Sequence, residues 1–186
     1  PTKKPMTVIV LDGSAVRQSA NDIDIVSSLI TIMASVGQQR EFAFILAERP
    51  EVVIGPTSLG SIDFADTMAL IDSELISGNT GISNIFGGLV QASTIIGLER
   101  PGLGSNVVLI TSGSSTENTN SVYKRIIPLV DQLVDQLNEV HVITIGSTSD
   151  VTMEFANSIS SRSGGEHFAI QNINDINNEI TRIVSN

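Results

Sequence analysis

The chain alternates between short stretches that are almost continuously apolar and longer stretches in which apolar residues recur every three or four positions. Short apolar runs rich in β-branched residues are typical of strands that are buried on both faces of a sheet. Recurrence every three or four positions is typical of helices that pack one face against a sheet. The pattern predicts strands at residues 6–11, 41–47, 52–54, 106–111, 140–145 and 167–170, and helices at residues 21–36, 63–71, 84–98, 120–137, 150–160 and 173–184.

The second and third predicted strands differ from the others in how they are connected. Residues 48–51 alone separate them, which is too short for a helical crossover. We therefore expect an antiparallel hairpin at one edge of the sheet, ended by Gly55 and Pro56. Pro128 falls within the fourth predicted helix and should kink or divide it, because proline lacks a backbone donor. Strands that alternate with helices indicate an α/β fold, doubly wound, with a mainly parallel sheet, one antiparallel edge strand and helices on both faces.

Composition limits the classes of protein to consider. The 186 residues suit a single domain over residues 1–186, which we expect to be cut from a longer chain because the sequence starts with Pro1. The net charge of −10 disfavours a nucleic-acid partner, and no apolar run is long enough to span a membrane. The lack of cysteine excludes disulfides and thiolate metal sites, and together with the missing start it leads us to expect an extracytoplasmic location.

The sequence contains few of the features that enzymes of this architecture need. The serine-rich turn after residue 111 lacks the Gly-x-Ser-x-Gly elbow of hydrolases, and neither Gly-x-Gly-x-x-Gly nor a P-loop is present. Of the two histidines, His141 lies within a predicted strand and is interpreted as structural, and nothing pairs His167 with a nucleophile. We therefore expect neither catalysis nor a cofactor.

Oxygen-bearing side chains follow two of the predicted strands. Asp12 and Ser14 follow the first, Ser112 follows the fourth, and a polar glycine-rich loop at residues 78–83 precedes a helix. Open α/β sheets form ligand sites where their parallel strands end, and Mg²⁺ prefers oxygen ligands of this kind. Asp12 has an alternative role as the cap of the following helix, and the serines have one as structural hydrogen-bonding groups.

Five segments taken together resemble a von Willebrand factor A domain from end to end: TVIVLDGSA, SNIFGGL, NVVLITSG, VHVITIG and SGGEHFAI, in this order. The resemblance implies the fold of that family and a metal-ion-dependent adhesion site at the carboxyl ends of the strands. In that family the site has the pattern Asp-x-Ser-x-Ser after the first strand, a Thr from the second loop and an Asp after the fourth strand.

This chain departs from the family's pattern. Asp12 and Ser14 match its first two positions, but Val16 has no oxygen where the second serine stands. Ser112 replaces the second Asp, so the site has one carboxylate instead of two. Losing even an outer partner of a metal ligand typically costs about 10- to 100-fold in affinity, and a lost carboxylate should cost more. We therefore expect a degenerate site without a metal.

The position of the family's Thr is taken by a different residue in this chain. Ser83 aligns best with it, and Thr80 is the competing choice. If a metal did bind, the resemblance names Asp12, Ser14 and Ser83 as ligands and Mg²⁺, Mn²⁺ or Ca²⁺ as the ion. Our hypothesis is instead that the hydroxyl groups of Ser14, Ser83 and Ser112 hydrogen-bond to Asp12 where the metal would be.

Three functions are compatible with this resemblance. The first is a non-enzymatic interaction or adhesion module that binds another protein, without a metal, through the strand-end loops at residues 12–16, 78–83 and 112–116. The second is cation-dependent adhesion, with substitute ligands in place of those that are lost. The third is a structural domain of a larger assembly that uses its helix faces.

Overall fold

The computed structural model describes residues 3–12, 30–31, 34, 40–58, 60–77, 84–99, 103–111, 119–135, 138–146, 150–171 and 175–185. The strands in this part of the chain form one sheet, in the order β3-β2-β1-β4-β5-β6. The strands are β1 Met6–Leu11, β2 Glu41–Leu46, β3 Val53–Thr57, β4 Asn106–Thr111, β5 Glu139–Ile145 and β6 His167–Ile170. Each of them overlaps one of the strands that the sequence pattern predicts.

The pairing of the strands confirms the predicted sheet. β1 lies near the middle of the sheet and pairs in parallel with β2 on one side and β4 on the other. The pairs β4–β5 and β5–β6 are parallel as well. β3 is antiparallel to β2 and forms one edge of the sheet. The sheet is therefore mainly parallel with one antiparallel edge strand.

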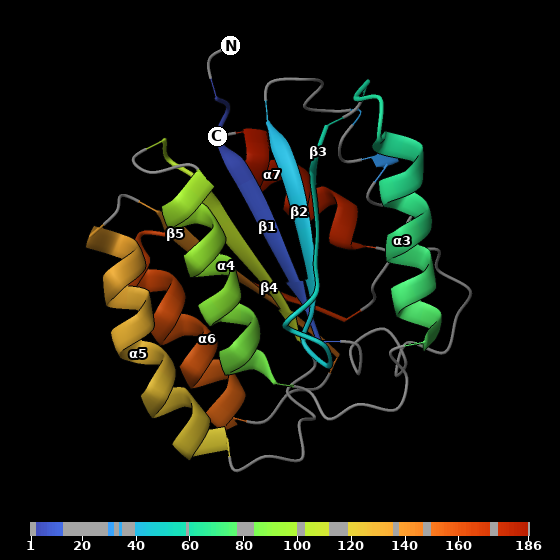
Figure 1. Ribbon diagram of the computed structural model, residues 1–186. Coiled ribbons are helices and arrows are strands. Elements are labelled where there is room, and N and C mark those ends of the chain that lie inside the picture. The colour runs from blue at the N-terminus through green and yellow to red at the C-terminus, as the bar shows by residue number, and fades with distance from the viewer. Residues whose placement is uncertain are drawn as a thin grey trace.

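Helices cover both faces of this sheet (Figure 1). One face packs against α4 Ile85–Glu99, α5 Thr119–Asp135 and α6 Asp150–Ser163. The other face packs against α3 Phe64–Ser77 and α7 Ile176–Ser185. This is the doubly wound α/β arrangement that the alternation of strands and helices predicts.

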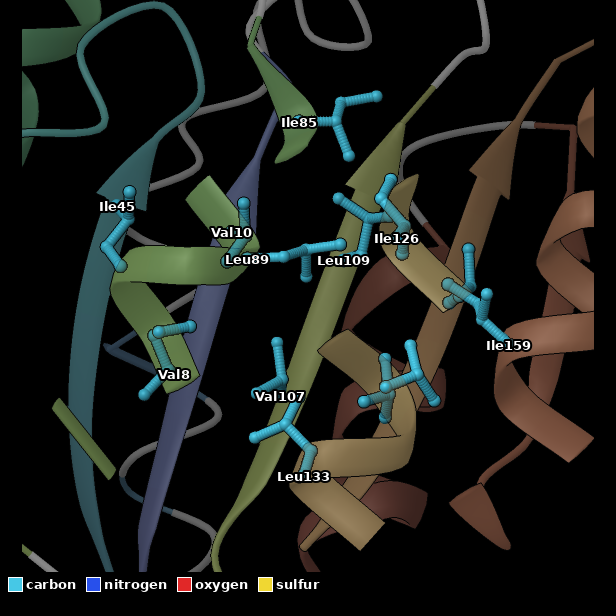
Figure 2. Packing of buried hydrophobic residues seen from close by; sticks show 14 of the residues in the cluster. Val8, Val10, Ile45, Ile85, Leu89, Val107, Leu109, Ile126, Leu133 and Ile159 are labelled. Atoms are coloured by element: carbon cyan, nitrogen blue, oxygen red, sulfur yellow. The ribbon is translucent and has the colours of Figure 1, made fainter. Parts of the chain in front are cut away.

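Alternate side chains of the central strands enter two separate cores, one on each face. In β1, Val8 and Val10 belong to the core under α4, α5 and α6, whereas Ile9 and Leu11 belong to the core under α3 and α7. Figure 2 shows Leu89 of α4 reaching from the helix toward the strands of the first core. Both faces of β1 are therefore buried, and each Å² of buried apolar surface contributes about 25 cal/mol to stability. Strands of this kind are held most strongly in the fold.

The ends of β3 and α3 differ from the prediction. β3 does not end at Gly55 and Pro56 but runs through them to Thr57. An edge strand tolerates proline, because an N–H on its outer side has no strand to pair with. α3 does not stop near Ile71 but continues to Ser77, since neither glycine nor proline interrupts it before residue 78.

Pro128 does not divide α5, which is unbroken from its first residue to its last. The proline is exposed, so water can reach the carbonyl that has lost its helical donor one turn earlier. Of the helix predicted at residues 21–36, positions 30, 31 and 34 are described and are helical. The rest of that predicted helix lies outside the described residues.

A small apolar cavity lies between α3 and the sheet. Ile9 of β1, Phe42 and Phe44 of β2, and Met68 and Ile71 of α3 line it, and its free volume is ≈ 10 Å³. A water molecule needs at least this much space and also two to four polar partners. The lining also contains Thr57 and Thr67, but their hydroxyls donate to Asp63. The cavity is therefore a gap in the packing under α3 and not a ligand site.

Gly88 marks a close approach between α4 and β1. A Cβ added at Gly88 would lie 2.7 Å from Cγ1 of Val10. We expect the substitution Gly88→Val to lower the free energy of unfolding by about 1–3 kcal/mol, the usual cost of overpacking a core. Urea unfolding measures the change. The matched control is Thr94→Ala on the exposed side of the same helix, which should stay within about 0.5 kcal/mol of wild type. Equal stability of Gly88→Val and wild type would contradict this close packing.

Candidate functional site

β1 and β4 end side by side, and the residues at their ends meet at one edge of the sheet. Leu11 of β1 is level with Ile110 of β4, and the Asp12 N–H donates to the Ile110 carbonyl at 2.9 Å. The hydroxyl of Thr111 donates to Oδ2 of Asp12, also at 2.9 Å. Both side chains are buried, with exposed fractions of 0% for Asp12 and 1% for Thr111. A carboxylate and a hydroxyl from neighbouring strands therefore form one hydrogen-bonded pair.

Backbone hydrogen bonds attach the beginning of α4 to the same edge. The Ala47 N–H donates to the Leu11 carbonyl, and the Ala47 carbonyl accepts the Asn84 N–H, each at 2.8 Å. Oδ1 of Asn84 accepts the N–H of Gly87 at 2.8 Å and so caps the helix. In Figure 1, α4 begins near the ends of β1 and β2. Ser83 directly precedes Asn84 in the sequence and lies outside the described residues.

The burial of Asp12 sets the electrostatics of this edge. An ionised carboxylate is costly to bury unless its oxygens receive hydrogen bonds or a compensating charge. Thr111 supplies a neutral donor, and hydrogen bonds to charged groups contribute roughly 1.5–3 kcal/mol. The hydroxyl thus offsets part of the cost of removing the carboxylate from water. Within the described ranges, no three or more His, Cys, Asp and Glu side chains gather as a metal site.

Neither histidine lies at this edge. His141, near the beginning of β5, is buried, and burial lowers its pKa against the opposing charge of Glu139. Burial also lowers the pKa of His167, whose ring nitrogens lie 2.9 Å from Oγ1 of Thr144 and 2.8 Å from Oδ1 of Asn157. Thr144 is 1% exposed, so its hydroxyl is not accessible to a substrate. These contacts fit the structural role that the sequence suggests for His141.

The likeness of this chain to known proteins lies in its structure. The sequence matches no family model and no curated protein. The structure is similar to that of a von Willebrand factor type A protein from Catenulispora acidiphila, with a TM-score of 0.68 and 14% sequence identity. The match covers 99% of this chain and 42% of that one. This chain has the von Willebrand factor A fold.

Two further solved structures are similar along the whole chain. The pilus adhesin SpaC from Lactobacillus rhamnosus GG, in its open conformation, has a TM-score of 0.71 and 14% identity over 100% of this chain and 30% of its own. BatB from Bacteroides thetaiotaomicron has a TM-score of 0.67 and 13% identity over 97% of both chains. The expected von Willebrand factor A fold is therefore confirmed, and the site has to be argued from the residues of this chain.

Of the residues that align with the metal site of von Willebrand factor A domains, Asp12 is described, and it lies where the resemblance requires, directly after β1. The others lie outside the described residues: Ser14, Val16, Thr80, Ser83 and Ser112. The hydrogen-bonded network proposed for the three serines stays a prediction.

Thr111 is a partner of Asp12 that the sequence analysis missed. The sequence pattern draws attention to hydroxyl groups that follow a strand, whereas Thr111 is the last residue within one. Strand register could have identified it. When two parallel strands run level, the residue after one strand lies next to the last residue of the other, as Asp12 lies next to Thr111.

We expect Thr111→Val to destabilise the domain, because a near-isosteric methyl replaces the hydroxyl that donates to buried Asp12. The expected loss is about 1.5–3 kcal/mol, the net contribution of a hydrogen bond to a charged group. The control Thr111→Ser keeps the hydroxyl and loses one methyl group, worth about 0.8 kcal/mol. Urea unfolding at pH 7 compares the two, and a larger loss for the serine variant than for the valine variant would contradict the pairing.

Proposed function

We propose that this chain is a protein-interaction domain of von Willebrand factor A type that binds another protein at the edge where β1 and β4 end, and that it does so without a divalent cation. The observation that carries the proposal is the buried carboxylate of Asp12, which already accepts a hydrogen bond from the hydroxyl of Thr111. A group held in this way has a structural partner that does not depend on a metal.

The donor set supports the metal-free reading. Mg²⁺ requires about six oxygens in octahedral geometry and is usually held by one or two carboxylates. In the sequence, Val16 and Ser112 stand where the family has a hydroxyl ligand and a second carboxylate. Asp12 is therefore the single acidic group that the family pattern retains. Cation-dependent adhesion with substitute ligands is the alternative that this chemistry favours less.

The fold and the charge of the chain support a protein as the partner. One of the similar structures is a pilus adhesin, and adhesion is one form of protein interaction. The net charge of −10 opposes binding to nucleic acid, and no described helix is long and apolar enough to cross a membrane. We extend the proposal to an extracytoplasmic location, because the sequence contains no cysteine. We also extend it to a role without catalysis, because the sequence has none of the catalytic motifs considered above.

The proposal predicts that the thermal stability of the domain does not respond to divalent cations. Melting is followed by circular dichroism in 5 mM MgCl₂, MnCl₂ or CaCl₂ and in EDTA, and we expect equal midpoints. A cation at 100 times its Kd would add about 2.7 kcal/mol to the stability. That gain corresponds to roughly 5–10 °C for a domain of this size. A shift of this size that disappears in Asp12→Ala would establish the cation-dependent alternative.

The matched positive control restores the family's ligands. The double substitution Val16→Ser with Ser112→Asp returns an oxygen and a carboxylate to the two positions where this chain lacks them. We expect isothermal titration with Mg²⁺ to detect binding to this variant and none to wild type. Failure of the variant to bind would mean that the loops, as well as the ligands, differ from a metal site.

The location of the partner surface is tested by photocrosslinking in the cells that make the protein. A photoreactive residue is placed at Val16 or Ser112 in the strand-end loops, or at Ala69 on the exposed side of α3 as the control. We expect partner crosslinks from Val16 and Ser112 and none from Ala69. Crosslinks from Ala69 alone would instead favour a structural domain that docks through its helices.

A further inference from the structure

The turn between α6 and β6 lies directly on the first half of β5. Oγ of Ser163, the last residue of α6, accepts the Val140 N–H at 2.9 Å, and the Val142 N–H donates to the Glu166 carbonyl at 3.1 Å. A Cβ added at Gly165 would collide with the Val140 carbonyl, so the turn requires glycine there. The turn is therefore fitted closely to the backbone of β5.

His141 adds a side-chain contact between β5 and this turn. The Glu166 N–H donates to Nδ1 of His141 at 3.1 Å. Because a backbone N–H can only donate, Nδ1 carries no proton, and the neutral ring has its proton on Nε2. Nε2 lies 3.2 Å from Oε2 of Glu139, and the residue is 6% exposed. A proton added at Nδ1 would meet the hydrogen of the Glu166 N–H.

We propose that His141 is an acid-sensitive latch on this edge of the sheet: its neutral ring holds the turn at residues 164–166 against β5, and protonation at Nδ1 releases the turn and β6. The proton occupies the lone pair that accepts the Glu166 N–H, so this N–H loses its acceptor in a partly buried contact, at a cost in free energy. Histidine is also the side chain whose ordinary pKa lies closest to neutral pH, so a small acidification reaches it first.

The charged groups around His141 determine the pH at which the latch opens. Burial lowers the pKa of His141 most, the carboxylates of Glu139 and Glu166 raise it, and the guanidinium of Arg40 before β2 lowers it. From α7, Arg182 lies 3.9 Å from the carboxylate of Glu166 and also pairs with a glutamate of its own helix. The sum of these effects is a lowered pKa, which keeps the ring neutral near pH 7.

The direction of the pH effect follows from this lowered pKa. In the open state the ring is solvated and titrates near its ordinary value of about 6.5. Above that pH both states are neutral, and the latch contributes fully. As the pH falls below it, the open state binds a proton that the closed state does not, so opening becomes more favourable. The effect levels off below the pKa of the closed state.

β6 is the strand that can open at the smallest cost. It has 4 residues, and β5 is its one neighbour among the described strands. Of its side chains, that of Ile170 is buried and the others are not. Every residue of β1 and of β4 is buried by contrast. Strands with few buried apolar contacts open locally without unfolding the rest of a domain. Loss of the His141 contact therefore acts on the least anchored part of the sheet.

His167 provides an internal control. It lies in β6, and its ring nitrogens face the Thr144 hydroxyl of β5 and the side-chain oxygen of Asn157 of α6. Both oxygens can accept a hydrogen from a protonated ring, because the hydroxyl can rotate. Burial lowers the pKa of His167, but its protonation breaks no hydrogen bond. The latch therefore depends on His141 and not on the histidine of the released strand.

Amide hydrogen exchange followed by NMR between pH 8 and pH 5, corrected for intrinsic rates, tests the latch in the intact chain. We expect the protection of the Glu166 and Val142 amides to fall by up to roughly 30-fold, the limit for one proton with an open-state pKa near 6.5. The Ala47 amide donates to the Leu11 carbonyl at the end of β1, which does not neighbour β6, and it should keep its protection. In His141→Gln the pH dependence should vanish, and in His167→Gln it should remain.

Several results would overturn the latch. One is a pKa of 6.5 or more for the His141 ring in an NMR titration of the wild-type protein. Another is a pH dependence that persists in His141→Gln or vanishes in His167→Gln. A loss of protection shared equally by the Ala47 amide would show global unfolding instead of local release. If His141→Gln does not fold, the titration and the exchange profile of the wild-type protein decide the question without it.

Discussion

The pairing of β1 between β2 and β4 is the constraint on which the rest of the structure depends. Both faces of β1 are buried, so its register cannot slip by one residue without moving every side chain to the wrong core. A fixed register also determines which residues meet where the strands end. It puts Asp12 beside Thr111 and brings Ala47 to the end of β1, where Ala47 in turn holds the beginning of α4. The candidate site is thus a consequence of how the core is packed.

The same burial explains why most of the fold could be predicted from the sequence. A strand buried on both faces has to be an unbroken apolar run, and a helix on a sheet has to repeat its apolar residues every three or four positions. The prediction failed at positions that are not buried in this way. β3 has one neighbouring strand, so Gly55 and Pro56 do not end it, and Pro128 lies on the exposed side of α5, where it does not divide the helix. Glycine and proline therefore predict a break wrongly at positions where tertiary packing constrains the residue little.

The candidate site was less predictable than the fold, for a different reason. Asp12 could be identified because it directly follows a buried apolar strand and matches the first position of the family's pattern. Thr111 was harder to identify, because threonine is common in strands and its hydroxyl gains a role only through the register with β1. The relation of Ser14, Ser83 and Ser112 to Asp12 depends on loop conformation, which no periodicity in the sequence encodes. The sequence alone does support the statement that the site has one carboxylate where the family has two.

The sheet also divides the interior into two cores, one under α3 and α7 and the other under α4, α5 and α6. Among the described residues, these cores have no side chain in common. Substitutions in contact with each other couple energetically, whereas distant substitutions without shared partners add. The effects of substitutions on opposite faces on stability should therefore be almost additive, because the backbone of the strands lies between the two cores. The cavity under α3 gives the core under α3 and α7 some spare volume that need not disturb the other core. A domain built in this way can diverge far in sequence one face at a time, while the strand ends that carry the candidate site stay in register.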